Sequence, residues 1–221
     1  MITMEEQQSL FIAVGRRLSR RVTAYAVGGT AMMFHGFKDA TLDIDLVFES
    51  AVDQEVFKRA LIALGWESMD ARIVYGGKRN RPSMFQLGDA RFDLFVVNVV
   101  NFTFSEGMKN RSVQTRQYGD NLFLRVADPH DIILMKCATD RAKDKEDVKK
   151  ILERSTISWS VLVEESKQQA LLGDELAVLE LGCFLEKLDN EMNVPVPQEV
   201  LNELFKMVEF QVKKRITRGK K

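Results

Sequence analysis

The chain has few of the residues that build disulfide scaffolds and metal-thiolate sites. Among 221 residues it has two cysteines, two histidines and four prolines, and its 32 basic residues are balanced by 32 acidic ones. Cys137 and Cys183 lack the spacing of metal ligands and suit a reducing cytoplasm, so no disulfide framework is expected. The balanced charge argues neither for nor against a nucleic-acid partner, and only local basic clusters can indicate one.

Long apolar runs are also missing. The longest, such as residues 92–100, are interrupted by Asp93 and Asn98 and are too short to span a bilayer. The N-terminus, MITMEEQQSL, is acidic and polar and does not resemble a signal peptide. Apolar residues make up 45% of the chain and charged residues 29%, an ordinary globular composition. We therefore expect a cytoplasmic protein with no membrane partner.

The residues that are present divide the chain near residue 127. Before that point strands and helices alternate, and after it, from the helix start at Asp128-Pro129, the pattern is helical throughout. The predicted fold class is α/β (α+β), with an α/β core over 1–127 of mixed, twisted sheet flanked by helices, and a C-terminal helical domain over 128–221. The predicted helices span 4–20, 30–35, 52–64, 128–152, 159–172, 175–188 and 197–216, and the predicted strands span 23–27, 42–48, 83–87, 91–97 and 122–126.

Two carboxylates on one strand are the most informative feature. Asp43 and Asp45 flank Ile44, and because alternate side chains of a strand share a face, both aspartates point the same way. Two such charges about 5 Å apart repel by about 3 kcal/mol at an effective dielectric near 20. A structural segment gains nothing from this repulsion, whereas an oxygen-preferring cation such as Mg²⁺ explains it.

A third acid is expected if the pair holds metal for phosphoryl chemistry. Asp93 lies in the strand Arg91-Phe-Asp-Leu-Phe-Val-Val97, on the face opposite Phe92 and Leu94. One interpretation is a surface ion pair between Arg91 and Asp93 on an edge strand. The other, which we favour given the aspartate pair, places Asp93 beside Asp43 and Asp45, where three carboxylates could hold two Mg²⁺ ions.

A glycine pair precedes the aspartates. Gly28 and Gly29 follow the predicted strand 23–27 and could form only a tight turn. They also precede a short helix, whose N–H groups together with the Thr30 hydroxyl would form a phosphate cradle. Glycines let phosphates approach the backbone closely. We therefore predict that Gly28, Gly29 and Thr30 bind a nucleotide.

This combination resembles the DNA polymerase β-type nucleotidyltransferase superfamily. Its pattern, a hydrophobic residue, two small residues and then acid-hydrophobic-acid-hydrophobic, is matched by Val27-Gly28-Gly29, a gap of thirteen residues and Asp43-Ile44-Asp45-Leu46. The string GGTAMMFHGFKDATLDIDL is similar to a small bacterial and archaeal branch that includes abortive-infection toxins of the AbiEii type. Lys38 stands where that branch more commonly has arginine.

A second part of the resemblance lies in residues 134–148. The branch has a similar helix, reading Leu-x-Lys, Arg-x-Lys-Asp and then Asp-hydrophobic. Spacing would place five charged side chains on one helical face, which alone would suit a solvated face with ion pairs. The resemblance implies instead that Lys136 approaches the triphosphate, with nearby cations oriented by carboxylates. The five residues of that face are Lys136, Asp140, Lys143, Asp144 and Asp147, and the resemblance also implies that Arg141 and Lys143 lie near Lys136.

The resemblance implies a polymerase β-like core that transfers a nucleoside monophosphate from an NTP to an acceptor hydroxyl. Asp43, Asp45 and Asp93 would be the catalytic and metal-binding residues, with two Mg²⁺ ions, or Mn²⁺, as cofactor. The acceptor could be RNA such as tRNA, or a protein, and a toxin of this kind would have a cognate antitoxin as partner. The alternatives are a small-molecule, antibiotic-type nucleotidyltransferase and a catalytically silent nucleotide-binding module.

Other polar residues give weaker signals. His35 suits a capping or packing role, His130 at a helix start suits a structural role, and Thr41 could support the aspartates from the strand entry. Basic clusters at 109–125 and 213–221 could bind an acceptor nucleic acid, or could simply be a solvated surface and a frayed terminus.

Overall fold

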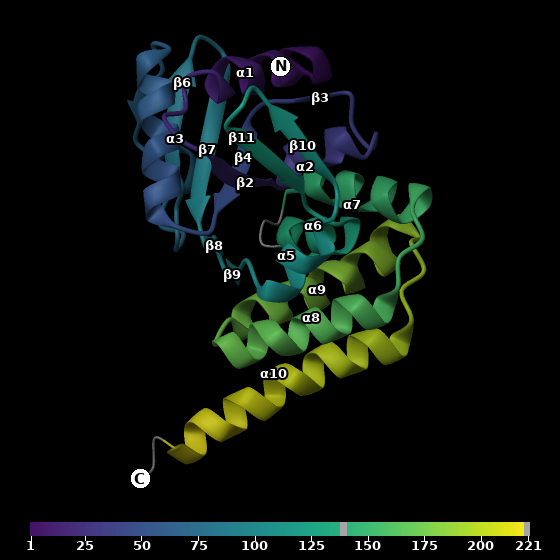
Figure 1. The fold of residues 1–221 in the computed structure, drawn as a ribbon. Coiled ribbons are helices and arrows are strands. Elements are labelled where there is room, and N and C mark those ends of the chain that lie inside the picture. Colours follow the sequence, from purple (N-terminus) through teal and green to yellow (C-terminus); the bar gives the residue numbers. More distant parts are fainter. Residues whose placement is uncertain (138–140, 219–221) are drawn as a thin grey trace. The chain divides into compact units, whose positions relative to one another are not determined.

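The computed structural model describes residues 1–137 and 141–218, which fall into two compact units (Figure 1). The first unit consists of residues 1–100 and 106–128, and the second of residues 101–105 and 129–221. The sequence did not indicate that the short segment 101–105 belongs with the C-terminal helices. No helix in the described ranges is long and apolar enough to cross a membrane.

The first unit is built on a mixed sheet with the strand order β10-β11-β2-β4-β7-β6-β5. Two neighbouring pairs, β11 with β2 and β4 with β7, are parallel, and the remaining pairs along this path are antiparallel. The predicted mixed sheet is therefore confirmed. The strands of this unit are β1 (Ile2–Thr3), β2 (Val22–Ala26), β3 (Ala40–Thr41), β4 (Ile44–Phe48), β5 (Glu67–Met69), β6 (Ser83–Leu87), β7 (Ala90–Val96), β8 (Asn98–Val99), β10 (Thr115–Tyr118) and β11 (Leu122–Val126).

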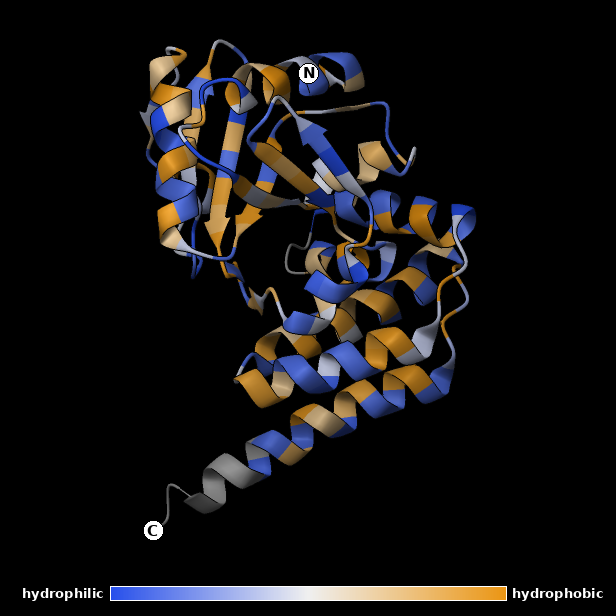
Figure 2. Ribbon diagram, viewed as in Figure 1, coloured by the Kyte–Doolittle hydropathy of each residue, from blue (hydrophilic) through white to orange (hydrophobic). Residues whose placement is uncertain are grey.

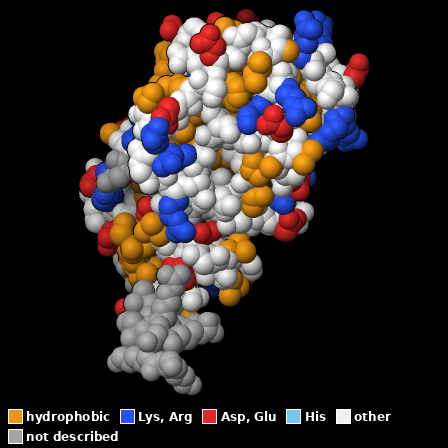
Figure 3. All heavy atoms as spheres, turned by 90° about the vertical axis from the view of Figure 1, so that its left-hand side faces the viewer, with side chains coloured by type: hydrophobic (Ala, Val, Ile, Leu, Met, Phe, Trp, Pro, Cys, Tyr) orange, Lys and Arg blue, Asp and Glu red, His pale blue; other side chains and the backbone are white. Residues whose placement is uncertain are grey.

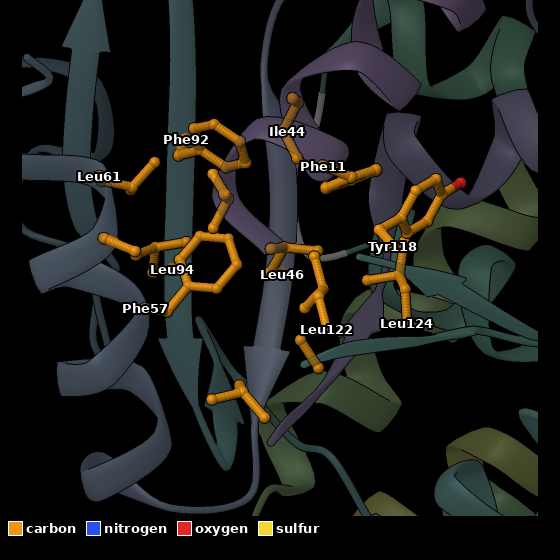
Figure 4. Close-up of a cluster of buried hydrophobic side chains, with 14 of the residues drawn as sticks. Phe11, Ile44, Leu46, Phe57, Leu61, Phe92, Leu94, Tyr118, Leu122 and Leu124 are labelled. Carbon is orange, nitrogen blue, oxygen red and sulfur yellow. The ribbon is translucent and has the colours of Figure 1, made fainter. Parts of the chain in front are cut away.

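Two helices cover one face of this sheet and enclose the core. The interior strands alternate as predicted, and Ile44, Leu46, Phe92 and Leu94 turn toward this face and are fully buried (Figure 4). Phe11 of α1 and Phe57 of α3 pack against them. The helices of the unit are α1 (Met4–Gly15), α2 (Gly28–Phe34), α3 (Ala51–Ala63), α4 (Arg72–Tyr75) and α5 (Glu106–Arg111).

The first helix is shorter than predicted. It ends at Gly15 instead of near residue 20, because the chain turns there against the backbone of Tyr118, where a side chain at position 15 would collide. The hairpin predicted between 83–87 and 91–97 is confirmed, since β6 and β7 pair antiparallel with Leu87 opposite Ala90. The N-terminal β1 pairs with β3, which fixes Thr41 opposite Ile2 just before the aspartates.

The second unit is helical. Its helices are α6 (Pro129–Lys136), α7 (Ala142–Arg154), α8 (Trp159–Leu172), α9 (Glu175–Met192) and α10 (Gln198–Arg218). Their apolar residues line the sides by which α8, α9 and α10 pack together (Figure 2). Gly182 of α9 allows the close approach of α10, because a Cβ there would lie 3.0 Å from the ring of Phe205.

Side chains of α8 and α9 hold the segment Asn101–Ser105, which contains β9 (Phe102–Thr103). The backbone N–H of Thr103 donates to Gln169 Oε1 (3.0 Å), and Gln169 Nε2 donates to the carbonyl of Thr103 (2.8 Å). The Ser105 hydroxyl donates to Glu165 (2.7 Å), and Asn101 donates to Glu180 (3.0 Å). The segment is therefore an integral strap of the helical unit.

The single helix predicted over 128–152 is wrong. The chain forms two helices there, because Arg141 has an extended backbone (φ −97°, ψ 137°) immediately before α7. Residues 138–140, including Asp140 of the predicted charged face, lie outside the described part of the chain. The interruption lets charged side chains of α6 and α7 face one another instead of following a single helical face.

Candidate active site

Three carboxylates meet where β4 and β7 run side by side. These strands are parallel, and Asp45 is the register partner of Asp93. Asp43 lies one residue before β4, in a bend that follows β3. One oxygen atom from each of the three carboxylates lies within 4.8 Å of the others. The structure thus places Asp93 beside the aspartate pair, as the favoured interpretation of the sequence expects.

Burial shows that the pairing of Arg91 with Asp93 is not an ordinary surface ion pair. β7 lies inside the sheet between β4 and β6, and the side chain of Asp93 is fully buried. Asp43 and Asp45 are only partly buried. The three acids therefore form a site with a buried floor and a more accessible rim.

The glycine pair brings the chain close to these carboxylates. Gly28 has φ +52°, and a Cβ at this position would lie 2.5 Å from Asp45 Oδ2. A Cβ at Gly29 would collide with the hydroxyl of Thr41. Both positions therefore exclude larger side chains, and at Gly28 the left-handed backbone adds to the requirement.

Threonine side chains tie the glycine turn to the aspartates. The hydroxyl of Thr30 accepts a hydrogen bond from the backbone N–H of Asp45 (2.9 Å), and Thr30 is fully buried. The backbone N–H of Val27 donates to the carbonyl of Asp45 (3.1 Å). Thr41 donates a long hydrogen bond to Asp43 (3.5 Å). Thr30 thus positions Asp45 in this structure, and its predicted contact with phosphate stays a prediction.

Two further side chains donate hydrogen bonds to the carboxylates, and one of them, Arg91, also carries a positive charge. Arg91 donates to both oxygens of Asp93, with Nε 2.8 Å from Oδ1 and Nη2 3.1 Å from Oδ2, and it also forms an ion pair with Asp43. The hydroxyl of Tyr75, at the end of α4, donates to Asp93 Oδ2 (2.7 Å). The ring of Tyr75 packs edge-on against Phe95, with centroids 6.1 Å apart. Sequence reasoning missed Tyr75, whose only local signal was the Gly76-Gly77 turn that follows it.

The environment shifts the protonation of these groups. Burial raises the pKa of Asp93, and the nearby Asp43 raises it further, although Arg91 and the Tyr75 hydroxyl oppose the shift. Burial likewise raises the pKa of Tyr75, together with the charges of Asp45 and Asp93, so its hydroxyl stays protonated. Burial opposes the charge of Arg91, but Asp93 and Asp43 outweigh this and raise its pKa. Arg91 is therefore a permanent countercharge in the site.

The donor set fits a hard divalent cation. Mg²⁺ prefers carboxylate oxygens, and three carboxylates that meet within 4.8 Å provide them. Each carboxylate has about four lone-pair positions, so the bonds from Arg91 and Tyr75 leave acceptor capacity on Asp43 and Asp93. The residues present thus fit the predicted metal, and the arrangement can hold a cation next to a proton-accepting carboxylate.

The charged residues predicted on the C-terminal side lie in the second unit. Nζ of Lys136 lies 2.8 Å from Asp144 and 2.7 Å from Asp147, and Arg141 pairs with Asp144 at 2.7 Å. Burial opposes the charge of Lys136, but the two carboxylates outweigh it and raise its pKa. The structure thus groups Lys136, Arg141, Asp144 and Asp147, while Lys143 is an exposed residue of α7.

The weaker candidates have structural contacts. His35 hydrogen-bonds the carbonyl of Ala127 (2.9 Å), and His130 accepts from the backbone N–H of Ser158 (2.9 Å). In the basic cluster 109–125, Lys109 pairs with Glu49 and Glu106, and Arg125 donates to the carbonyl of Ser112. In the terminal cluster, Lys213 pairs with Glu209, and the side chains of 214–221 lie outside the described residues.

Comparison with known proteins identifies the family. Residues 16–176 match the model of a family described as "Nucleotidyltransferase of unknown function (DUF6036)". No curated protein sequence matches the chain. A solved structure of ANT(2")-Ia in complex with adenylyl-2"-tobramycin is similar at a TM-score of 0.47 and 14% identity, over 82% of this chain and 98% of that one.

Proposed function

The chain belongs to this nucleotidyltransferase family, and we propose that it transfers a nucleoside monophosphate from an NTP to an acceptor hydroxyl with the help of Mg²⁺. The observation that carries the proposal is the meeting of Asp43, Asp45 and Asp93 within 4.8 Å. Arg91 pairs with two of these carboxylates and offsets part of their mutual repulsion, and a bound metal ion would offset the rest. All three acids are present, which argues against a catalytically silent nucleotide-binding module.

Each residue near the carboxylates has a proposed role. Asp43 and Asp45 would hold two Mg²⁺ ions, or Mn²⁺, and Asp93 would share one of them. Bound there, the ions would neutralise phosphate charge and lower the pKa of the acceptor hydroxyl. Asp93, whose pKa is raised by burial, would accept the proton of that hydroxyl. Arg91 would keep the carboxylates oriented through the bonds that it makes to Asp43 and Asp93.

The nucleotide would be bound by two groups of residues. The backbone of Gly28 and Gly29, with Thr30, would cradle the phosphates, since neither glycine has room for a side chain. Lys136 would neutralise phosphate charge, supported by Arg141 and Lys143. Asp144 and Asp147 fix the ammonium group of Lys136, and this supports a positioning role for them.

The acceptor and the biological role are proposed from the resemblance of the motif. The motif from Gly28 to Asp45 resembles that of abortive-infection toxins, which favours RNA such as tRNA, or a protein, as acceptor. A toxin of this kind would act in the cytoplasm and would be neutralised by a cognate antitoxin. Growth arrest on induced expression, relieved by Asp43→Asn, is the expected cellular result.

The experiment that tests the activity supplies the purified chain with labelled NTPs, Mg²⁺ and candidate acceptors. Bulk tRNA, total protein and aminoglycosides would be offered separately, since an antibiotic-type transferase would label only the last. We expect labelling that Asp43→Asn and Asp45→Asn each reduce at least a hundredfold. Asp89→Asn, which changes an exposed turn acid of the same unit, is the matched control. Unchanged labelling in Asp43→Asn would refute the proposal.

A further inference from the structure

A second candidate binding site lies in the same unit as the carboxylates. Residues 70–72, at the start of α4, and residues 78–82, in the loop after it, line a pocket of about 610 Å³. This volume falls within the usual range for ligand pockets. None of the pocket residues is an acid of the carboxylate cluster. The pocket therefore needs an explanation of its own.

The pocket is strongly basic. Its lining includes Arg72, Lys78, Arg79 and Arg81 but only one acid, Asp70. Arg72 engages that acid through its side chain, with Nη2 2.7 Å from Oδ2, and hydrogen bonds from Arg72 lower the pKa of Asp70 to about 2. Three further cations surround the pocket in a chain that has no net charge. On the face shown in Figure 3, Lys and Arg side chains likewise lie in separate groups, so positive charge is local and not spread evenly.

Hydrogen bonds brace the loop that carries these cations. Arg81 Nη1 donates to the carbonyls of Gly76 (3.1 Å) and Lys78 (3.3 Å). Asn80 has a left-handed backbone (φ +45°), and its side chain donates to the carbonyl of Val100 (2.8 Å). A loop fixed in this way loses little conformational freedom when a ligand binds.

A four-residue helix connects the pocket to the carboxylates. α4 begins with Arg72, which lines the pocket, and ends with Tyr75, whose hydroxyl donates to Asp93. A ligand bound in the pocket would thus be held next to the element that contacts the buried floor of the site.

We propose that this pocket binds phosphate groups of a polynucleotide acceptor strand. The inference rests on the proposed nucleotidyl transfer and deepens it by naming the class of acceptor. Lysine and arginine are the residues that bind phosphate, and arginine can do so with two hydrogen bonds. The proposed function assigns the phosphates of the NTP to the glycine turn, the metal ions and Lys136, none of which lines this pocket. A polycationic small molecule would be repelled by the same pocket.

The test compares two double variants that remove the same residue types. Lys78→Ala/Arg79→Ala removes pocket cations but keeps Arg81 and Asn80, which hold the loop. Lys58→Ala/Arg59→Ala removes an adjacent lysine and arginine from α3 in the same unit. The probe is a labelled single-stranded oligoribonucleotide of about 12 nucleotides, and its binding is followed by fluorescence anisotropy with Mg²⁺ at several salt concentrations.

We expect the pocket variant to bind the oligoribonucleotide about tenfold more weakly than wild type. The slope of log affinity against log salt concentration should also be shallower, by the amount that corresponds to the loss of about one to two phosphate contacts. The α3 variant should match wild type, and Mg·NTP affinity should be the same in all three proteins. Equal oligoribonucleotide binding by the two double variants would overturn the inference. So would a loss of Mg·NTP affinity with oligoribonucleotide binding intact, because the pocket would then hold the nucleotide's own phosphates.

The binding assay separates this inference from the proposed function. Asp43→Asn is expected to abolish transfer. When Asp43→Asn is added to each double variant, the pocket variant should still bind the oligoribonucleotide more weakly than the α3 variant. Should wild type transfer nucleotide to no acceptor while the pocket variant still loses oligoribonucleotide binding, the pocket stands and the proposed function fails. If wild type and the Lys78→Ala/Arg79→Ala variant label RNA equally well, the proposed function stands and the pocket inference fails.

Discussion

Asp45 and Asp93 are register partners on two parallel strands, but they differ in burial. Asp45 is partly buried, whereas Asp93 is fully buried and accepts hydrogen bonds from Arg91 and Tyr75. The two carboxylates are thus equivalent by position in the sheet and unequal by environment. This inequality suits a division of labour between metal binding and proton acceptance.

Replacing Gly28 by alanine should impair metal binding more than it impairs stability. A Cβ there would lie 2.5 Å from Asp45 Oδ2, and the backbone is left-handed (φ +52°). We expect a loss of about 1–2 kcal/mol in unfolding free energy and at least a tenfold loss in Mg²⁺ affinity. Gly65→Ala is the matched control, since Gly65 is also left-handed (φ +86°) but has open space around its Cβ position. Calorimetry that finds equal Mg²⁺ affinity in both variants would contradict the prediction.

Replacing Asp93 by asparagine should stabilise the metal-free protein at neutral pH. Burial raises the pKa of Asp93 in the folded state above its unfolded value near 4. The contribution of Asp93 to the free energy of unfolding is therefore fully present below the unfolded pKa and is lost as the pH rises through the folded pKa. The amount lost is about 1.4 kcal/mol for each unit by which the folded pKa exceeds the unfolded one. The advantage of Asp93→Asn should accordingly grow between pH 4 and pH 8 in denaturant unfolding. Saturating Mg²⁺ should stabilise wild type more than Asp93→Asn, and a variant that gains equally from Mg²⁺ would argue against Asp93 as a ligand.

Removing the hydroxyl of Tyr75 should shift the pH dependence of transfer. Its hydrogen bond to Asp93 favours the charged carboxylate, so Tyr75→Phe should raise the pKa of Asp93 further. The acidic limb of the rate profile should move to higher pH, with a severalfold loss of rate at pH 6 and little loss at pH 9. Tyr118→Phe, which removes the hydroxyl of another buried tyrosine in the same unit, should leave the profile in place. An unshifted profile in Tyr75→Phe would show that this hydrogen bond does not tune Asp93.

Removing the charge of Lys136 should destabilise the second unit strongly. Lys136→Met removes the cation that Asp144 and Asp147 share, and Arg141 remains as a partner of Asp144 alone. Removing one partner of a buried ion pair typically costs about 3–5 kcal/mol. Lys143→Met, at an exposed position of α7, should change the unfolding free energy by less than about 0.5 kcal/mol. Adding Asp144→Asn and Asp147→Asn to Lys136→Met should restore part of the loss. A stable single variant would mean that the two carboxylates find other partners.

The sequence predicted the features that depend on local pattern and spacing. Alternation in β4 and β7 placed Ile44 and Phe92 in the core and Asp45 and Asp93 on the opposite face. The predicted strand 42–48 begins only at Ile44, and Asp43 lies in the bend before it. The Gly-Gly and Asp-x-Asp motifs led to the site, because their residue types have few structural uses.

What the sequence did not reveal depends on contacts between distant segments. Tyr75 reaches Asp93 across eighteen positions, and nothing near Tyr75 indicates that partner. The break before α7 was missed because residues 128–152 have continuous helical character. The backbone at Arg141 is extended instead, and α6 and α7 are joined by ion pairs of Lys136.

The strap Asn101–Ser105 makes the chain pass between its two units three times, after Val100, after Ser105 and after Asp128. A truncation at residue 128 would therefore not yield two autonomous fragments. The N-terminal piece would carry Phe102 and Phe104, both buried in the intact chain, and the helical piece would lack the backbone that Gln169 binds. Replacing the helical unit by that of a related protein, in evolution or in engineering, thus requires that two separate segments, 101–105 and 129–221, be exchanged together. A single crossover would exchange only one of them.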